Sequence, residues 1–198
     1  MEVKEYRGIR GLVYAEVTKD DKDGYTCGEV KELIPVAELS RTTETSSETK
    51  YYDNVPAIVI DSTGADEVTI TGSAFPFDVL ADITGQIYDE TLGMFVEGER
   101  QAKYFAIGYI TKKTDGTEVF VWRLKGKFNI PDSTHISEND GTDANGQELT
   151  FTGINTNHKF TKTGKSAKAV NVDTSINAVV EADFFETVQT PDTVTKAV

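Results

Sequence analysis

The sequence predicts an all-β dominated fold: an antiparallel two-sheet β-sandwich or barrel with one flanking α-helix and long inter-strand loops. Apolar and polar residues alternate along most of the chain, which is typical of strands because successive side chains point to opposite faces. Clusters of Asp, Gly, Asn, Ser and Thr separate the alternating runs. Such clusters indicate turns between consecutive strands.

The clearest alternating run is EVFVWRLKGKF, residues 118–128. Its two faces differ in chemistry, with Phe120, Trp122, Leu124 and Phe128 on one and Arg123, Lys125 and Lys127 on the other. This pattern predicts a strand buried on one face only. The run KYFAIGYITKK, residues 103–113, precedes it, and the Asp115-Gly116 pair between them favours a tight turn. The two runs therefore predict an antiparallel hairpin.

Five further runs predict strands. They are GLVYAEV (11–17), VKELIPVAEL (30–39), VPAIVI (55–60), DEVTITGSAF (66–75) and QELTFTGINTNHKF (147–160). Polar clusters at Asp61–Gly64 and Asp140–Gly146 have the composition of turns. Together with the hairpin, these runs make an antiparallel all-β arrangement the simplest interpretation.

One helix interrupts the strands at FPFDVLADITG, residues 75–85. Pro76 suits a first helical turn and Gly85 suits a helix end. Val79, Leu80 and Ile83 fall on one side at helical spacing. We expect this helix to lie against an open end or face of the sheets.

A second, shorter helix is suggested by DFFETV, residues 183–188. Asp183 and Glu186 have the spacing of a capping box, and Pro191 follows as a stop signal. Its length indicates a minor element.

Length and composition indicate one soluble domain, residues 1–198. A chain of 198 residues can bury roughly 70% of its unfolded surface, and no repeat or Pro/Gly/Ser-rich linker divides it. The 33 acidic and 20 basic residues give a net charge of −13, which disfavours adhesion to phosphate backbones and anionic lipid. No apolar run reaches the length of a signal peptide or of a membrane span, about 18 residues. We expect no membrane association and no secretion.

No arrangement of residues in the sequence predicts an enzyme. His135 and His158 are the only histidines, and neither has a neighbouring acid or nucleophile in a catalytic pattern. The stretch TGKS, residues 163–166, ends like a phosphate-binding loop, but Lys159 stands where that loop requires glycine. The DSTG stretch at Asp61 departs by one residue from the aspartic protease triplet and reads as a turn. We expect no catalytic residue.

Metal and cofactor sites are likewise not predicted. The polar loop SENDGTDANGQE, residues 137–148, has carboxylates and glycines that suggest calcium, but neither of its glycines places acidic ligands at the spacing of a calcium loop. Cys27 is the only cysteine, so it can form no intramolecular disulfide. We expect no metal and no cofactor.

One polar stretch lacks a reason to fold by itself. From Thr42 to Lys50 threonine recurs, yet neither set of alternate positions forms an apolar face. The adjacent Tyr51 and Tyr52 could stack on bases but have no basic groove beside them. The stretch is either a mobile surface loop or an arm whose partner is another chain. The arm residues would be Arg41, Thr42, Thr43, Glu44, Thr45, Ser46, Ser47, Glu48, Thr49, Lys50, Tyr51 and Tyr52.

Long ordered segments of the chain carry a family resemblance. They are KEYRGIRGLVYAEVTKDD, SRTTETSSETKYYDNVPAIVIDSTGADEVTI, FDVLADITGQIYDE, KYFAIGYITKKTDGTEVFVWRLKGKFNIPD and HKFTKTGK, with a weaker echo in FFETVQTPDT. In these segments the chain resembles the major tail protein, or tail-tube subunit, of long-tailed bacteriophages with non-contractile tails. The resemblance runs from near residue 1 to about Lys165 and leaves a C-terminal extension from about residue 166.

The resemblance implies a structural virion protein that assembles into hexameric rings, which stack into the phage tail tube and conduct DNA during ejection. The polar arm or loop at about 41–52 would then pack on a neighbouring subunit or ring. Implied partners are further copies of the chain, the tape-measure protein, and tail-terminator or baseplate proteins. DNA would pass an acidic lumen transiently, without sticking. The implied location is the virion tail, after synthesis in the bacterial cytoplasm.

Two alternatives stay open at this stage. The same resemblance fits the tube subunit of a phage-tail-like bacteriocin. A non-enzymatic β-sandwich binding module, of adhesin or baseplate type, would also be an acidic all-β protein. Such modules usually show clustered exposed aromatic residues or a calcium loop, and neither is evident in this sequence.

Overall fold

A computed structural model describes residues 3–135, 137 and 146–197. The strands are β1 (Tyr6–Asp21), β2 (Gly24–Cys27), β3 (Lys31–Glu32), β4 (Val36–Tyr52), β5 (Val55–Gly72), β6 (Ile87–Asp89), β7 (Met94–Val96), β8 (Phe105–Lys113), β9 (Glu118–Phe128), β10 (Gln147–Gly153) and β11 (Ala169–Asp173). The helices are α1 (Phe77–Thr84) and α2 (Glu181–Glu186). The all-β prediction is confirmed, because antiparallel strands dominate and the described helices are two and short.

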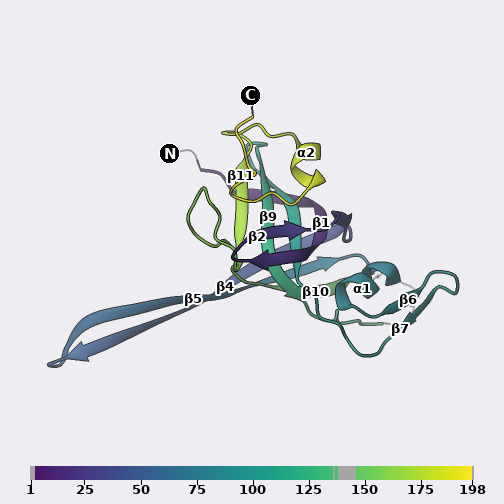
Figure 1. Ribbon diagram of the computed structural model, residues 1–198, viewed down its shortest axis with the longest axis horizontal. Helices are drawn as coiled ribbons and strands as arrows, with labels where there is room; N and C mark the ends of the chain where they lie inside the picture. Colours follow the sequence, from purple (N-terminus) through teal and green to yellow (C-terminus); the bar gives the residue numbers. More distant parts are fainter. Residues whose placement is uncertain (1–2, 136, 138–145, 198) are drawn as a thin grey trace.

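The strands form one large sheet and one small one. In the large sheet the order is β2-β1-β8-β9-β10-β5-β4, with β3 also paired to β1 and β11 also paired to β9. All pairings between these strands are antiparallel. The small sheet consists of β6 and β7. Figure 1 shows β4 and β5 leaving the body of the molecule as a long hairpin.

The large sheet curls around a first apolar core. Residues from both ends of the strand order meet there, including Leu12 and Tyr14 of β1 and Val68 and Ile70 of β5. The middle strands and α1 complete this core with Ile83, Phe105, Ile107, Phe128, Leu149 and Phe151, each at most 1% exposed. Because burial of each large side chain contributes about 1.5–3 kcal/mol, this core is a main source of stability.

A second core covers the opposite face of β8 and β9. Trp122, Phe120 and Leu124 pack there with Phe160 and with Phe184 of α2. The Trp122 Nε1 group donates a hydrogen bond to the Phe184 carbonyl at 3.1 Å. The chain after residue 166 therefore contributes β11 and α2 to the same body.

The expectation that β9 is buried on one face only is wrong. The two cores enclose both faces of the strand, so Arg123 and Lys125 are buried although they are charged. Each has a carboxylate partner, as described below. A bulge also changes which side chains share a face, since Phe105 pairs with Gly126 but Ile107 pairs with Arg123. Phe128 consequently lies in the first core, not beside Trp122.

The α1 prediction is confirmed, whereas the cap predicted for the second helix is wrong. Helix α1 follows Pro76 and ends at Gly85, which has a left-handed φ of 71° and donates its N–H to the Ala81 carbonyl at 2.8 Å. Helix α2 begins after Val180, which has no side-chain capping bond. Asp183 lies within the first turn of the helix, so it cannot be the capping residue. The capping position is occupied by the apolar Val180.

The remaining turn, loop and strand predictions had different outcomes. The β8–β9 hairpin is confirmed, with Gly116 at a φ of 88° in its turn. The turn predicted at Asp61–Gly64 is wrong, because β5 runs through it and Ser62 pairs with Ser46 of β4. The strand predicted over 147–160 ends at Gly153. Residues 140–145 of the predicted turn cluster and most of the polar loop 137–148 lie outside the described residues.

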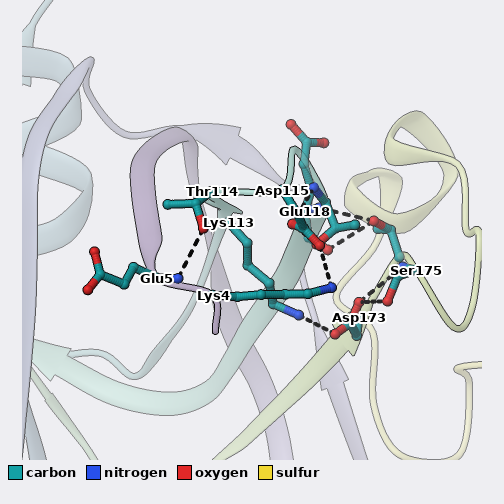
Figure 2. A network of polar contacts seen from close by, with 10 residues as sticks. Lys4, Glu5, Lys113, Thr114, Asp115, Glu118, Asp173 and Ser175 are labelled. Atoms are coloured by element: carbon teal, nitrogen blue, oxygen red, sulfur yellow. Dashed lines mark hydrogen bonds and ion pairs between the residues drawn. The ribbon is translucent and has the colours of Figure 1, made fainter. Parts of the chain in front are cut away.

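A polar network joins the N-terminal segment to the β8–β9 turn and to β11 (Figure 2). Lys4 forms an ion pair with Asp115 at 2.5 Å, and the Glu5 N–H donates to Thr114 Oγ1 at 3.2 Å. Lys113 pairs with Asp173 at the end of β11. The hydrogen bond from Lys113 lowers the pKa of the Asp173 carboxyl to about 2. The network fixes three segments that are distant in sequence.

Replacement of Gly126 by alanine should destabilise the fold. A Cβ atom at Gly126 would overlap with the Phe151 ring and lie 2.5 Å from the Thr152 carbonyl oxygen. Overpacking of this kind costs about 1–3 kcal/mol. We expect Gly126→Ala to lower the free energy of unfolding in urea by that amount. Gly98→Ala is the control, because a Cβ there meets no atom within 4 Å, and an equal loss in both variants would contradict the expectation.

Candidate functional site: the projecting arm

The most unusual feature of the molecule is a two-stranded arm formed by residues 43–66. Strands β4 and β5 pair from Val36 and Gly72 to Tyr52 and Val55, but β5 pairs with β10 only between Asp66 and Gly72. Between Asp66 and the tip, the two strands pair only with each other among the described residues. At about 3.3 Å per residue, strands of this length span roughly 30 Å. Figure 1 shows the arm projecting from the body.

The tip of the arm is a tight two-residue turn. Asp53 and Asn54 both have positive φ angles, 50° and 63°, and Tyr52 pairs directly with Val55. Positive φ at both central residues defines a type I′ turn, whose twist matches that of paired strands. Asp and Asn tolerate this conformation better than most residues. The hairpin is therefore closed locally by its own sequence.

The arm exposes a row of apolar side chains. Tyr51 and Tyr52 of β4 are 64% and 61% exposed, and Val55, Ile58, Val59 and Ile60 of β5 are 50–60% exposed. Large apolar side chains gathered on a projecting element mark an interaction surface more often than a free surface. VPAIVI, expected from the sequence to be an ordinary hydrophobic strand, is the exposed partner of the polar stretch.

The candidate arm residues from the sequence all lie on β4, but they divide into two groups. Arg41 and Thr43 lie at the root and contact the body. From Glu44 to Tyr52 every side chain is exposed, and the polar contacts there are internal to the hairpin, such as the bond between Ser46 and Ser62 at 2.7 Å. The sequence did not reveal β5 as the second strand of the arm, although the Asp53-Asn54 pair is a hairpin signal.

The arm also presents unpaired strand edges. Strand β4 is the last strand of the sheet, and β5 has no second neighbour between Val55 and Ala65 in the described part of the chain. Such edges can pair with another chain, and proteins usually shorten, charge or cover them. The long edges and the exposed apolar side chains together make this hairpin suited to docking.

A buried carboxylate holds the root of the arm. Asp66, 4% exposed, accepts hydrogen bonds from Arg123 Nη1 at 2.8 Å and from Lys168 Nζ at 3.1 Å. Thr43 Oγ1 donates a third bond at 3.0 Å, and Arg41 lies 3.9 Å away. Burial opposes ionisation of Asp66, but the bonds from Lys168 and Thr43 outweigh it, so the pKa of this carboxyl lies below its ordinary value of 3.8. The cluster joins both arm strands to β9.

A similar ion pair neutralises the second buried cation of β9. Lys125 Nζ lies 2.5 Å from the Asp20 carboxylate of β1, which also accepts the backbone N–H groups of Asn157 and His158 at 2.9 Å. Burial opposes ionisation of Asp20, yet these bonds hold its pKa below the ordinary value. This pair explains why a lysine is tolerated between two apolar cores.

The remaining sequence candidates do not come together. His135 lies in the segment after β9, while His158 packs edge-on against Phe160 with ring centroids 5.2 Å apart. Cys27 is half-buried on β2, where burial raises the pKa of its thiol to about 11. Residues 3–135, 137 and 146–197 contain no group of three or more His, Cys, Asp or Glu side chains arranged to hold a metal ion.

Comparison with known proteins gives no assignment. No protein-family model matches the chain, and no curated protein matches it. In the described part of the structure, no helix is both long and apolar enough to cross a membrane.

Replacement of Asp66 by asparagine should strongly destabilise the protein. Removal of one partner from a buried ion pair leaves an uncompensated charge and costs about 3–5 kcal/mol, and Arg123 would be that charge. We expect Asp66→Asn to lower the free energy of unfolding in urea by about 3 kcal/mol or more. Asp61→Asn, an exposed position on the arm, should change it by no more than about 0.5 kcal/mol. Similar small losses in both variants would show that the cluster does not stabilise the root.

Stability should fall as the pH drops below about 4. Asp20 and Asp66 have folded-state pKa values below the ordinary 3.8, so the unfolded chain binds protons first and acid favours it. The stabilisation by these carboxylates is therefore present above pH 4 and lost as the pH falls through their folded pKa values. Urea unfolding at pH 7, 5, 4 and 3 should show this loss, with a smaller decline in Asp66→Asn. An identical decline in the free energy of unfolding in wild type and Asp66→Asn would exclude Asp66 as a source of this pH dependence.

Proposed function

We propose that this protein is a structural, self-assembling subunit of a phage tail tube, or of the tube of a phage-tail-like bacteriocin. The observation that carries the proposal is the arm: a two-stranded extension with exposed apolar side chains on both strands and unpaired edges. The resemblance of the chain to major tail proteins supports the same assignment. In the assembly, subunits form hexameric rings that stack, and the arm of each subunit packs on a neighbour.

The physical chemistry of the arm favours a partner that is another folded surface. Two isolated strands are marginally stable in water. The hairpin is therefore stabilised most when another chain covers its apolar side chains and backbone edges. A contact repeated at every subunit needs only modest strength, because a closed ring forms each contact simultaneously with the others. The arm suits this role, since the body buries two cores without it.

The charge of the chain fits a conduit for DNA. A net charge of −13 per subunit gives a ring a strongly negative field, which repels phosphate groups and disfavours sticking. The same charge opposes association of the subunits, so apolar contacts or local ion pairs must offset it. Salt screens this repulsion over about 8 Å at physiological ionic strength.

Shortening the arm should prevent assembly and leave the subunit folded. Residues 46–62 can be replaced by Asn-Gly, so that Thr45 and Thr63, which face each other in the hairpin, flank a two-residue turn. This change spares Arg41, Thr43 and Asp66 at the root. Wild-type protein at high concentration should form rings or tubes in negative-stain electron microscopy, and the shortened variant should stay monomeric with an unchanged thermal unfolding midpoint.

The controls separate assembly from folding. Ser47→Ala changes an exposed polar arm position and should leave assembly intact. Tubes from a folded, shortened variant would contradict the role of the arm. Wild-type protein that stays monomeric at all concentrations tested would contradict the proposed function itself.

A further inference from the structure

Charge is distributed unevenly along this acidic chain. Between Lys50 and Arg100 the sequence contains ten carboxylate residues and no Lys or Arg. Residues 156–168 show the reverse, with four lysines and no Asp or Glu. Segments of opposite charge in one chain can meet within a subunit or between subunits. The structure shows which lysines have carboxylate partners inside the subunit.

Within residues 156–168, three lysines gather on one rigid turn, residues 159–165, which we call the basic turn. The Phe160 N–H bonds to the Lys165 carbonyl at 3.0 Å, and the Gly164 N–H bonds back to the Phe160 carbonyl at 2.7 Å. Phe160 is 2% exposed and anchors the turn in the second core. Asp192 accepts the N–H groups of Thr161 and Lys162 at 2.9 and 2.7 Å. The turn is thus fixed from both sides.

The cations of the basic turn have no carboxylate partner among the residues that the structure describes. Most other Lys and Arg side chains do, including Lys168, whose partner is Asp66, and Lys125, whose partner is Asp20. Lys159, Lys162 and Lys165 are exposed, and Lys162 Nζ donates a hydrogen bond to the Val194 carbonyl at 2.6 Å. Within the described part of the chain, none of these three ammonium groups lies within 4 Å of a carboxylate. Three cations on one fixed turn are therefore available to an anionic partner.

The complementary surface is the small hairpin β6–β7. Residues 86–99 contain four carboxylates, those of Asp89, Glu90, Glu97 and Glu99, and no basic residue. Glu90, Glu97 and Glu99 are exposed and take part in no ion pair among the described residues. Ile87, Leu92 and Met94 beside them are also exposed, by 68%, 70% and 46%. A two-stranded sheet with an uncovered apolar face is marginally stable alone, which favours a covering partner.

We propose that the basic turn of one copy docks on the acidic β6–β7 hairpin of a second copy. The two surfaces cannot meet within one subunit, because β11, into which the basic turn leads, and β6–β7 lie on opposite sides of the body (Figure 1). Two complementary surfaces at different places on one molecule generate a head-to-tail contact, which closes into rings or extends into stacks. The inference rests on the proposed self-assembly and names one contact that offsets the repulsion between acidic subunits.

Nucleic acid is the less favoured partner for the basic turn. The net charge of −13 repels a polyanion at long range. The single aromatic residue of the turn, Phe160, is buried, so it offers no ring on which a base could stack. A second copy of the chain is the better partner, because its acidic β6–β7 hairpin attracts the basic turn at short range. Covering the exposed apolar side chains of that hairpin also stabilises the contact.

The test is an exchange of charge between the two surfaces. The variant Lys159→Glu, Lys162→Glu, Lys165→Glu should raise the protein concentration for half-maximal assembly at least tenfold in sedimentation experiments. A second variant combines this triple substitution with Glu90→Lys, Glu97→Lys and Glu99→Lys. The two surfaces then again carry opposite charges, so assembly should be restored. The control variant Arg7→Glu, Lys112→Glu, Lys196→Glu makes the same charge change at three exposed positions elsewhere and should shift the concentration by less than threefold.

Each outcome separates this contact from the proposed function. If wild type assembles and the turn variant assembles equally well, the docking proposal is overturned while the tube proposal stands. Loss of assembly without rescue by the β6–β7 exchange would exclude β6–β7 as the partner surface. Normal assembly with lost binding to a fluorescent oligonucleotide would assign the turn to nucleic acid instead. Circular dichroism checks that each variant is folded, and Lys159→Gln, Lys165→Gln is the milder variant if the triple reversal unfolds.

Discussion

The antiparallel pairing of β4 with β5 is the contact on which the rest of the structure depends. Its inner half, from Asp66 to Gly72 of β5, also pairs with β10 and supplies Val68 and Ile70 to the first core. Its outer half pairs with nothing else in the described residues. One continuous ladder of hydrogen bonds thus belongs both to the folded body and to the arm, so the direction of the arm is set by the same register that closes the core.

Buried ion pairs make this arrangement possible. Strand β9 lies between two apolar cores and carries Arg123 and Lys125, which would be unstable there without partners. Asp66 and Asp20 supply those partners from β5 and β1, at separations of 57 and 105 residues. Because Asp66 also binds Thr43 and Lys168, the pair that neutralises Arg123 is also the anchor of the arm. Core stability and arm position are therefore coupled through one carboxylate.

The acidity of the chain gives the exposed lysines of the basic turn particular weight. Apolar side chains on the arm and on β6–β7 can drive association, but they do little to fix the relative orientation of two subunits, because the hydrophobic effect is not directional. Charges at fixed positions do fix it, since like charges repel each other when the subunits meet in a wrong register. A rigid basic turn and an acidic hairpin would select one relative orientation of two copies, while the arm would supply most of the buried apolar surface.

The sequence by itself determined the local structure of this protein. Alternating runs gave most strands, Asp115-Gly116 gave the β8–β9 turn, and Pro76 and Gly85 bounded α1, because these signals act between neighbouring residues. The inability of Thr42–Lys50 to form an apolar face was also evident. Only the tertiary structure decided that the apolar residues Val55–Ile60 are exposed, that both faces of β9 are buried, and that Asp66 pairs with Arg123. Burial depends on which distant strands become neighbours, and periodicity along one strand does not contain that information.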